Sequence, residues 1–111
     1  MSLPFVFMDL RTTDRERSRS FYAALFGWSA TESLFMGDSG PWGGLTQLAD
    51  GDERRPQWVP YVPVHDLDQA VARAVELGAT ANRPRVDLPQ GSVAVIEDPA
   101  GATVALWEPK G

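Results

Sequence analysis

The sequence contains no cysteine and only one histidine, His65. The absence of thiols excludes disulfide bonds, thiolate zinc sites, iron–sulfur clusters and cysteine nucleophiles. A single imidazole excludes any site that needs two histidines from one copy of the chain. No apolar run approaches the roughly 20 residues that cross a bilayer, and the N-terminus lacks the basic start of a signal peptide. We therefore expect a cytoplasmic protein with no membrane segment.

Positive charge is also scarce. Lys and Arg number 10 against 15 Asp and Glu, so the net charge is −5. Nucleic-acid binding needs clustered positive charge, and we therefore expect no nucleic-acid partner. The 111 residues leave room for one domain, and a hydrophobic content of 43% is enough for a folded core.

What the sequence does contain is one order of elements that occurs twice. In the first half a strand over 5–10 precedes the capping-box pattern Thr13–Glu16 and a helix that ends at Gly27. Strands are predicted over 28–36 and 43–49. In the second half a capping-box pattern and a helix again follow a strand. The elements predicted there are a strand over 58–64, a helix from Asp66 to Gly78, and strands over 79–86, 92–97 and 103–108.

The two halves are interpreted as duplicated units. Asp14 and Asp66 hold equivalent positions at the helix starts, 52 residues apart, and repeats of this length are typical of supersecondary units that bury one another. The first helix carries Phe21, Tyr22 and Leu25 at helical spacing, which predicts that this stripe and the following Trp28 are core. The expected boundaries within a single domain, 1–111, are 1–50 for unit one, 51–57 for the linker and 58–111 for unit two.

Four segments carry a resemblance to a known family. They are Phe21–Trp28 in unit one, and Trp58–Asp68 and Glu97–Ala102 in unit two, with Leu106–Pro109 after them. The chain resembles the glyoxalase/bleomycin-resistance/dioxygenase superfamily, also called vicinal oxygen chelate proteins, and most of all a glyoxalase-like subgroup often labelled "hydroxylase". The resemblance implies an α+β fold in which two tandem βαβββ units form a cupped eight-stranded mixed sheet with the helices outside.

The resemblance also implies four positions for the ligands of a divalent metal. Carried over to this sequence they are Phe7, Thr46 (or Gln47, since the register is open), Val59 and Ala105. Phenylalanine, valine and alanine have no lone pair to give, whereas a divalent ion needs at least three or four N, O or S ligands. We therefore expect no metal and no cofactor at this site.

Three polar side chains are weak candidates for catalysis. Asp9 shares a strand face with Phe7. One interpretation is a base or an anchor for a cationic ligand, and the other is a carboxylate near Arg11 at a strand end. His65 is either a ligand or base, or an exposed loop residue. Glu108 matches the family's glutamate only loosely, and its other interpretation is a solvated residue near the C-terminus.

Aromatic side chains stand where the metal ligands would be. Strand alternation places Phe5, Phe7, Tyr61 and Trp107 on that face, and Trp42 is expected in a glycine-rich loop over the mouth. A dry aromatic pocket with the Tyr61 hydroxyl suits a planar or apolar small molecule, although ordinary core or a dimer interface is also rich in aromatics. The full ligand-binding set that we expect is Phe5, Phe7, Asp9, Trp42, Thr46, Val59, Tyr61, Ala105 and Trp107.

Three functions follow from these residues. The first is a metal-free protein that binds a small molecule. The second is a divalent-metal-dependent lyase, isomerase or dioxygenase with a rearranged site that uses Asp9, His65 and Glu108. The third is a non-catalytic dimeric module. We favour the first and expect a homodimer, since the superfamily often pairs subunits; whether any reaction is catalysed stays open.

Overall fold

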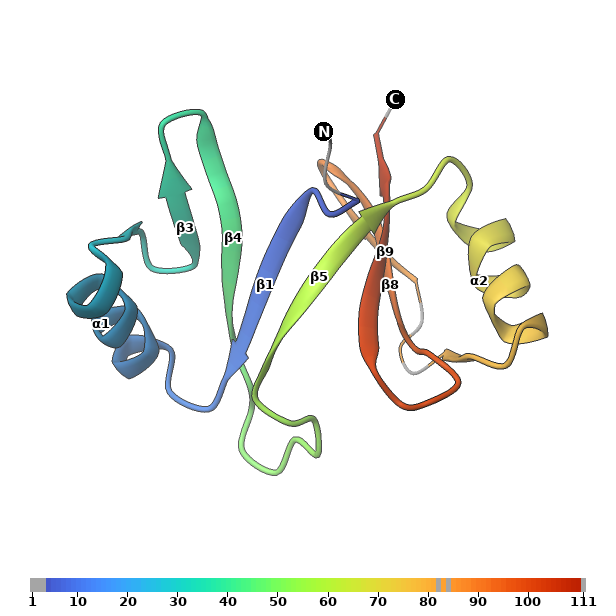
Figure 1. Ribbon diagram of the computed structural model, residues 1–111, viewed down its shortest axis with the longest axis horizontal. Coiled ribbons are helices and arrows are strands. Elements are labelled where there is room, and N and C mark those ends of the chain that lie inside the picture. The colour runs from blue at the N-terminus through green and yellow to red at the C-terminus, as the bar shows by residue number, and fades with distance from the viewer. Residues whose placement is uncertain (1–3, 82, 84, 111) are drawn as a thin grey trace. The chain divides into compact units, whose positions relative to one another are not determined.

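The fold is seen in a computed structural model that describes residues 4–81, 83 and 85–110. The chain divides into two compact units. We call Phe7–Val59 the N-terminal unit, and the residues up to Val6 together with those from Pro60 onward the C-terminal unit. Each unit has one helix and several strands (Figure 1). No helix among the described residues is long and apolar enough to cross a membrane.

The N-terminal unit has the order of strand, helix and three strands that the family resemblance implies. Its elements are β1 (Phe7–Thr12), α1 (Arg15–Phe26), β2 (Ser29–Ala30), β3 (Leu34–Gly37) and β4 (Gly40–Gln47). The strands lie in the order β2-β3-β4-β1. The first and last strands, β1 and β4, pair in parallel, whereas the other pairs are antiparallel, so this part of the sheet is mixed.

The C-terminal unit repeats this arrangement. Its elements are the end of β5 (Gln57–Pro63), α2 (Leu67–Glu76), β6 (Thr80–Ala81), β7 (Val86–Leu88), β8 (Gly91–Glu97) and β9 (Thr103–Pro109). The strand order is β5-β9-β8-β6, and β7 also pairs with β8. Here too the first and last strands, β5 and β9, are parallel, and the remaining pairs are antiparallel. The predicted α+β class with mixed strand directions is confirmed.

Three predicted strands differ from those observed. The strand expected over 28–36 is found as two strands, β2 and β3. The strand expected over 79–86 is found as two short strands, β6 and β7, and residues 82 and 84 between them lie outside the described residues. The strand expected to begin at Phe5 begins at Phe7 instead, and Phe5 precedes it with 45% of its surface exposed. Apolar alternation alone did not locate this boundary, because Phe5, Val6 and Phe7 are all apolar.

Both helix starts were predicted correctly from their capping patterns. The Asp14 side chain accepts a hydrogen bond from the Arg17 N–H at 3.0 Å, and the Asp66 side chain accepts one from the Gln69 N–H at 3.1 Å. Each bond satisfies an amide that has no partner within the helix. Gly27 ends α1 at a φ of 73°, a left-handed conformation that favours glycine.

The core of the N-terminal unit is largely aromatic. Leu10, Phe35 and Leu45 are buried, and Tyr22, Ala30, Trp28, Trp42 and Trp58 pack against them. The rings contact one another in stacked and edge-to-face arrangements, and the Trp58 indole N–H donates to the Tyr22 hydroxyl at 3.1 Å. These aromatic contacts, together with the hydrogen bond, stabilise the packing of α1 against its strands.

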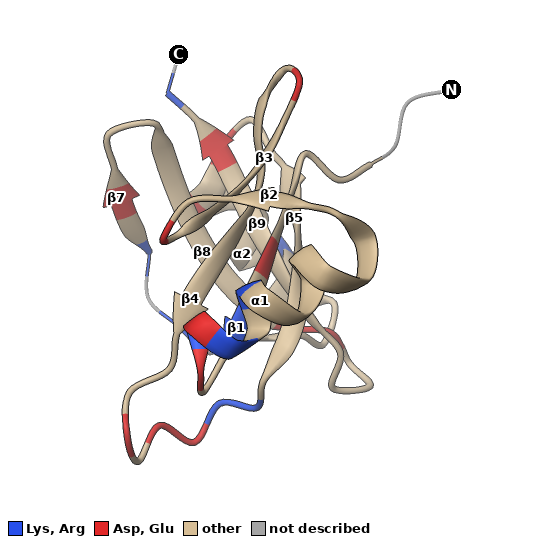
Figure 2. Cartoon of the chain, turned by 90° about the vertical axis from the view of Figure 1, so that its left-hand side faces the viewer, with Lys and Arg blue, Asp and Glu red and all other residues tan. Residues whose placement is uncertain are grey.

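The outer side of α1 is more apolar and more exposed than predicted. Phe21 and Leu25, expected in the core stripe, expose 56% and 57% of their surface, and Phe26 exposes 56%. The core prediction therefore holds for Tyr22 and is wrong for Phe21 and Leu25. Charged residues lie at the N-terminal end of α1, and its C-terminal half carries none (Figure 2).

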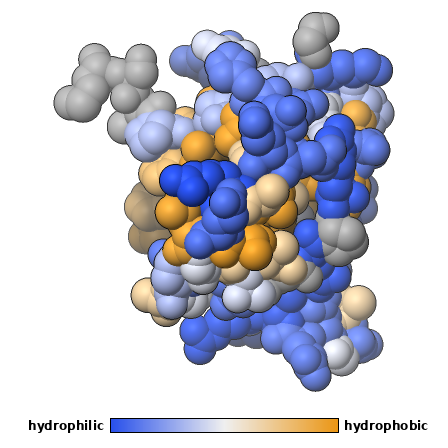
Figure 3. All heavy atoms as spheres, turned by 90° about the vertical axis from the view of Figure 1, so that its right-hand side faces the viewer, coloured by the Kyte–Doolittle hydropathy of each residue, from blue (hydrophilic) through white to orange (hydrophobic). Residues whose placement is uncertain are grey.

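The C-terminal unit has an aliphatic core between α2 and its strands. Leu67, Ala94, Ile96 and Leu106 are buried, and Val62, Val71 and Ala74 are among the residues that pack against them. On the side that carries α2, apolar atoms are exposed among hydrophilic ones (Figure 3). The large exposed hydrophobic residues of this unit, apart from those before β1, are Val75, Leu77, Val86 and Leu88.

The burial of α2 yields a test with a matched control. Leu67 is fully buried, whereas Leu77, at the other end of the same helix, exposes 62% of its surface. We expect Leu67→Ala to lower the free energy of unfolding by about 2–5 kcal/mol, because it leaves a cavity. Leu77→Ala should change it by less than about 0.5 kcal/mol. Urea unfolding followed by circular dichroism measures both, and equal losses would contradict this account of the core.

Candidate functional site

In the N-terminal unit, the pairing of β1 with β4 builds a polar face. The parallel register places Asp9 opposite Gly44 and Arg11 opposite Thr46. Residues between them, such as Leu10, point to the core beneath α1, so Asp9 and Arg11 lie on the opposite face. Both are nearly buried, with 7% and 6% of their surface exposed. A carboxylate and a guanidinium are thus held side by side on one strand.

Thr46 holds the Asp9 carboxylate. Its Oγ1 lies 3.0 Å from Oδ1 and 2.9 Å from Oδ2 of Asp9. Arg11 Nε lies 4.0 Å from Oδ2, and Arg54, which is hydrogen-bonded to Asp52, adds a further positive charge. Burial raises the pKa of the Asp9 carboxyl above 3.8, because a charged group loses its hydration there, while Thr46, Arg11 and Arg54 act in the opposite direction.

Gly44 provides the space that Asp9 occupies. A Cβ atom at this position would collide with Oδ1 of Asp9 and would lie 3.3 Å from the Phe7 ring. A side chain at position 44 would therefore displace the carboxylate or the ring. The register of β4 also settles the choice between Thr46 and Gln47. Only Thr46 lies on the Asp9 face, since the Gln47 amide bonds to the backbone at the start of α1.

In the C-terminal unit, the equivalent pairing of β5 with β9 builds an aromatic face. Tyr61 lies opposite Ala105, and Pro63 lies opposite Trp107. The Tyr61 and Trp107 rings are half-buried, with centroids 6.1 Å apart and planes inclined by 42°. Leu106, between them in register, belongs to the core beneath α2, so the two rings lie on the sheet face that α2 does not cover.

The four positions that the family uses for metal ligands do not fit a divalent ion in this chain. Phe7 is half-buried, and Val59 and Ala105 are fully buried, and none of the three has an atom that can bind a metal. The Thr46 hydroxyl is bonded to Asp9. Within the described residues, no three His, Cys, Asp or Glu side chains are grouped so as to hold a metal.

Glu108 has a structural role in the C-terminal unit. Its Oε1 accepts a hydrogen bond from the Leu67 N–H at 2.7 Å, at the first residue of α2. Its other oxygen lies 3.9 Å from the Arg85 guanidinium, which also bonds to Asp87 at 2.8 Å and to Asp68 at 3.0 Å. The carboxylate therefore ties β9 to the start of α2, where a negative charge is stabilising.

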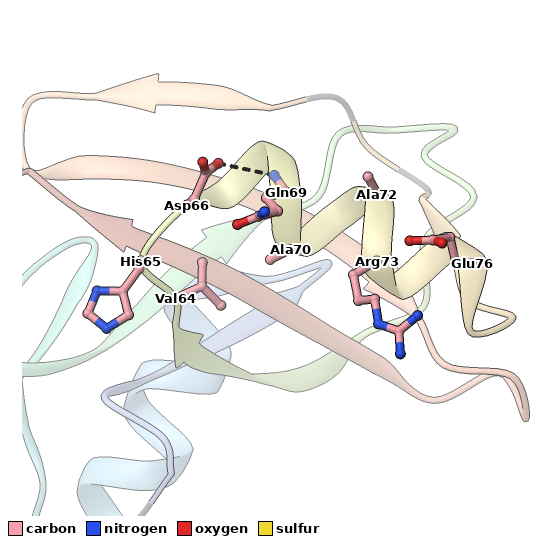
Figure 4. A pocket seen from close by; sticks show the side chains of 8 residues that line it. All are labelled: Val64, His65, Asp66, Gln69, Ala70, Ala72, Arg73 and Glu76. Carbon is pink, nitrogen blue, oxygen red and sulfur yellow. Dashed lines mark hydrogen bonds between the residues drawn. The ribbon is translucent and has the colours of Figure 1, made fainter.

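His65 lines a shallow pocket of about 460 Å³ along α2 (Figure 4). The imidazole is exposed, in the turn between β5 and α2. Val64 and Ala70 are apolar lining residues, and Gln69 and Arg73 extend from the helix beside them. No hydrogen bond or ion pair joins His65 to the rest of the described chain, so this structure gives no orienting partner for a base.

Two expected site residues lie elsewhere than predicted. Trp42 is in strand β4 rather than in a loop, and its ring stacks on Phe35 with centroids 4.9 Å apart. It contributes to the aromatic core of the N-terminal unit. Phe5 precedes β1 and is exposed. Sequence reasoning treated Arg11 only as a possible neighbour of Asp9 at a strand end. The signal of a buried pair was the spacing of the two residues, which puts them on one strand face.

Burial of Asp9 predicts how stability depends on pH. Because its pKa in the folded protein is raised above 3.8, the folded state keeps a proton that the unfolded chain has released. The contribution of Asp9 to the free energy of unfolding therefore falls as the pH rises from about 3.8 through the raised pKa. Asp9→Asn removes this fall. Urea unfolding of both proteins at a series of pH values measures the difference between them.

Asp98 is the matched control, because its shift has the opposite sign. The backbone N–H groups of Ala102 and Ala100 lie 3.0 and 2.8 Å from its Oδ1 and lower its pKa below 3.8. Its contribution is present above pH 3.8 and is lost as the pH falls through the lowered pKa. Two results would contradict the raised pKa of Asp9. In the first, the difference in the free energy of unfolding between wild type and Asp9→Asn does not depend on pH. In the second, this difference has the sign expected for Asp98→Asn.

Glu108 is tested through the stability of α2. Glu108→Ala removes the acceptor for the Leu67 N–H, and we expect a loss of about 1 kcal/mol in the free energy of unfolding. Glu108→Gln keeps an oxygen at this position and should lose less. Glu76→Ala, an exposed change near the end of the same helix, serves as the control. Thermal unfolding compares the three, and equal midpoints for Glu108→Ala and Glu76→Ala would exclude the capping role.

Comparison with known proteins gives results that agree with this geometry. The model of a family described as "Glyoxalase-like domain" matches residues 5–107. The putative glyoxylase CFP32 of Mycobacterium tuberculosis is 30% identical over 91% of this chain, and the anthracycline biosynthesis protein DauV of a Streptomyces species is 34% identical over 91%. A superfamily member from Vibrio splendidus superposes with a TM-score of 0.63 at 13% identity, covering 92% of this chain and 96% of its own.

The relatives are longer than the present chain. The match covers 44% of CFP32 and 40% of DauV, so this chain spans less than half the length of either. The match of the family model nevertheless extends through both units and covers almost all of the described residues. The chain therefore belongs to the glyoxalase-like domain family.

Proposed function

We propose that this chain binds a planar, largely apolar small molecule, and that the Tyr61–Trp107 pair of the C-terminal unit is its contact surface. The observation that carries the proposal is the position of these rings on neighbouring strands, with centroids 6.1 Å apart, on the sheet face that α2 leaves uncovered. Two half-buried aromatic rings on one face offer a large apolar area and little conformational freedom to lose on binding.

The strand next to Trp107 supports a flat surface. Gly91 of β8 has no side chain, and a Cβ atom there would lie 2.7 Å from Cζ2 of Trp107. The indole therefore lies over the β8 backbone. Val93, Val95 and Ala105 lie on the same face and are apolar, Glu97 and Thr103 lie at its far end, and the Tyr61 hydroxyl is a polar group beside Ala105. A planar ring system is complementary to such a surface.

The names of two relatives agree with this class of ligand. DauV and DnrV are both called anthracycline biosynthesis proteins, and an anthracycline contains a planar aromatic ring system. The metal-dependent alternative lacks support from the ligand positions, where Phe7, Val59 and Ala105 bind no cation. The binding step proposed here accordingly involves no metal. We keep a cytoplasmic setting and a homodimer as part of the proposal, and the exposed Phe21 and Leu25 of α1 favour self-association.

The test is a calorimetric titration with an anthracycline. We expect saturable binding to the wild type and at least tenfold weaker binding to Trp107→Ala and Tyr61→Ala, a loss of about 1.4 kcal/mol or more. Leu77→Ala is the control, since it removes an exposed apolar side chain away from this face and should leave the affinity unchanged. Wild-type affinity in both face variants would exclude the Tyr61–Trp107 surface.

A further inference from the structure

The Asp9 carboxylate has few hydrogen-bond donors for a buried charge. Its side chain is 10% exposed. Its hydrogen-bond partner in the described chain is the Thr46 hydroxyl, which lies within 3.0 Å of both carboxylate oxygens. A hydroxyl has one hydrogen, whereas an ionised carboxylate offers about four lone-pair positions. Thr46 therefore satisfies only part of the accepting capacity of Asp9.

Arg11 does not supply the missing donor. Its Nε lies 4.0 Å from Oδ2, which is beyond hydrogen-bond distance. Buried polar groups are usually fully hydrogen-bonded, because an unmet acceptor costs free energy away from water. The raised pKa of Asp9, with burial as its largest cause, is the consequence. A donor that reached this carboxylate would recover part of that free energy.

The charges around Asp9 determine which donor fits. Arg11 belongs to the same strand and Arg54 lies near enough for its charge to act on Asp9, so two guanidinium groups stabilise the ionised carboxylate from a distance. Arg54 is also bonded to Asp52 at 2.6 Å. A cationic ligand would be repelled by these arginines, whereas a neutral O–H or N–H group would not. The surroundings therefore favour a neutral donor over the cationic ligand considered from sequence alone.

Gly44 stands opposite Asp9 in register. The Asp9 carboxylate lies over this glycine, since a Cβ atom there would collide with its Oδ1. The half-buried Phe7 ring lies beside the same glycine. A donor attached to an aromatic ring would meet an acceptor and a ring surface within one stretch of β1.

We propose that the Asp9 carboxylate, held by Thr46 beside Arg11 and over Gly44, accepts a hydrogen bond from a neutral hydroxyl of an aromatic small molecule such as a phenol. This recognition point lies in the N-terminal unit, and it stands or falls separately from the Tyr61–Trp107 surface. The acceptor Asp9 occupies none of the four expected ligand positions, and Thr46, which does, takes up part of the accepting capacity of the carboxylate.

The experiment is a titration with phenol, followed by the backbone amide signals of β1 and β4 in nuclear magnetic resonance spectra. Anisole, which has the ring without the donor, and benzylammonium, which has a cationic donor, are the matched probes. We expect phenol to shift the signals around Asp9 and Gly44, anisole to shift them several-fold less at equal concentration, and benzylammonium to bind no more tightly than phenol.

Two variants separate recognition from a structural role. Asp9→Asn should weaken phenol binding several-fold, with its amide spectrum showing that the protein remains folded. Thr46→Val removes the internal donor and should strengthen phenol binding, because the carboxylate then has its full accepting capacity free. A purely structural effect of the cluster would weaken binding in both variants.

The outcomes that overturn the proposal are distinct. Phenol that leaves the β1 and β4 signals unchanged, or binds wild type and Asp9→Asn equally, excludes Asp9 as the acceptor. Tighter binding of benzylammonium than of phenol excludes a site for neutral donors. Phenol shifts confined to β5 and β9 would support the Tyr61–Trp107 surface and refute the Asp9 site. Phenol shifts at β1 and β4, without any binding of an anthracycline, would support the Asp9 site and refute the Tyr61–Trp107 surface.

Discussion

The pairing of the first strand of each unit with the last strand of the same unit, in parallel, is the constraint on which the rest of this structure depends. A parallel pair needs a long crossover, and in each unit a helix and further strands provide it. The pairing brings together residues that are far apart in the chain. The Asp9 carboxylate is hydrogen-bonded to Thr46 in one unit, and the Tyr61 ring lies near the Trp107 ring in the other.

The repeat shows how the two units have diverged at one place. With the spacing of 52 residues between the helix-start aspartates, Asp9 corresponds to Tyr61 and Arg11 corresponds to Pro63. The same strand positions therefore carry a charge pair in the N-terminal unit and an aromatic face in the C-terminal unit. Phe7 and Val59 correspond by the same spacing and are two of the four ligand positions expected from the resemblance, and neither side chain can bind a metal.

Local signals in the sequence predicted the helices and most strands. Asp14 and Asp66 bond to amides within the next few residues, so the capping pattern contains its own partners. The failures concern contacts at long range. Trp42 looks like a loop residue among glycines, because the pairing of β3 with β4 that makes it a strand residue involves other parts of the chain. Glu108 looks solvated, because its partner, the Leu67 N–H, is 41 residues away. The candidate faces followed from alternation, whereas the depth of burial of Asp9 did not.

The distribution of tryptophan has a consequence for spectroscopy. Trp28, Trp42 and Trp58 lie together in the core of the N-terminal unit, with centroids between 4.8 and 6.4 Å apart, whereas Trp107 lies in the C-terminal unit. Indoles at such separations exchange excitation energy and produce coupled near-ultraviolet signals. Trp107 is the one tryptophan of the C-terminal unit and lies on the proposed binding face. Replacing it by phenylalanine would leave tryptophan emission that comes from the N-terminal unit alone.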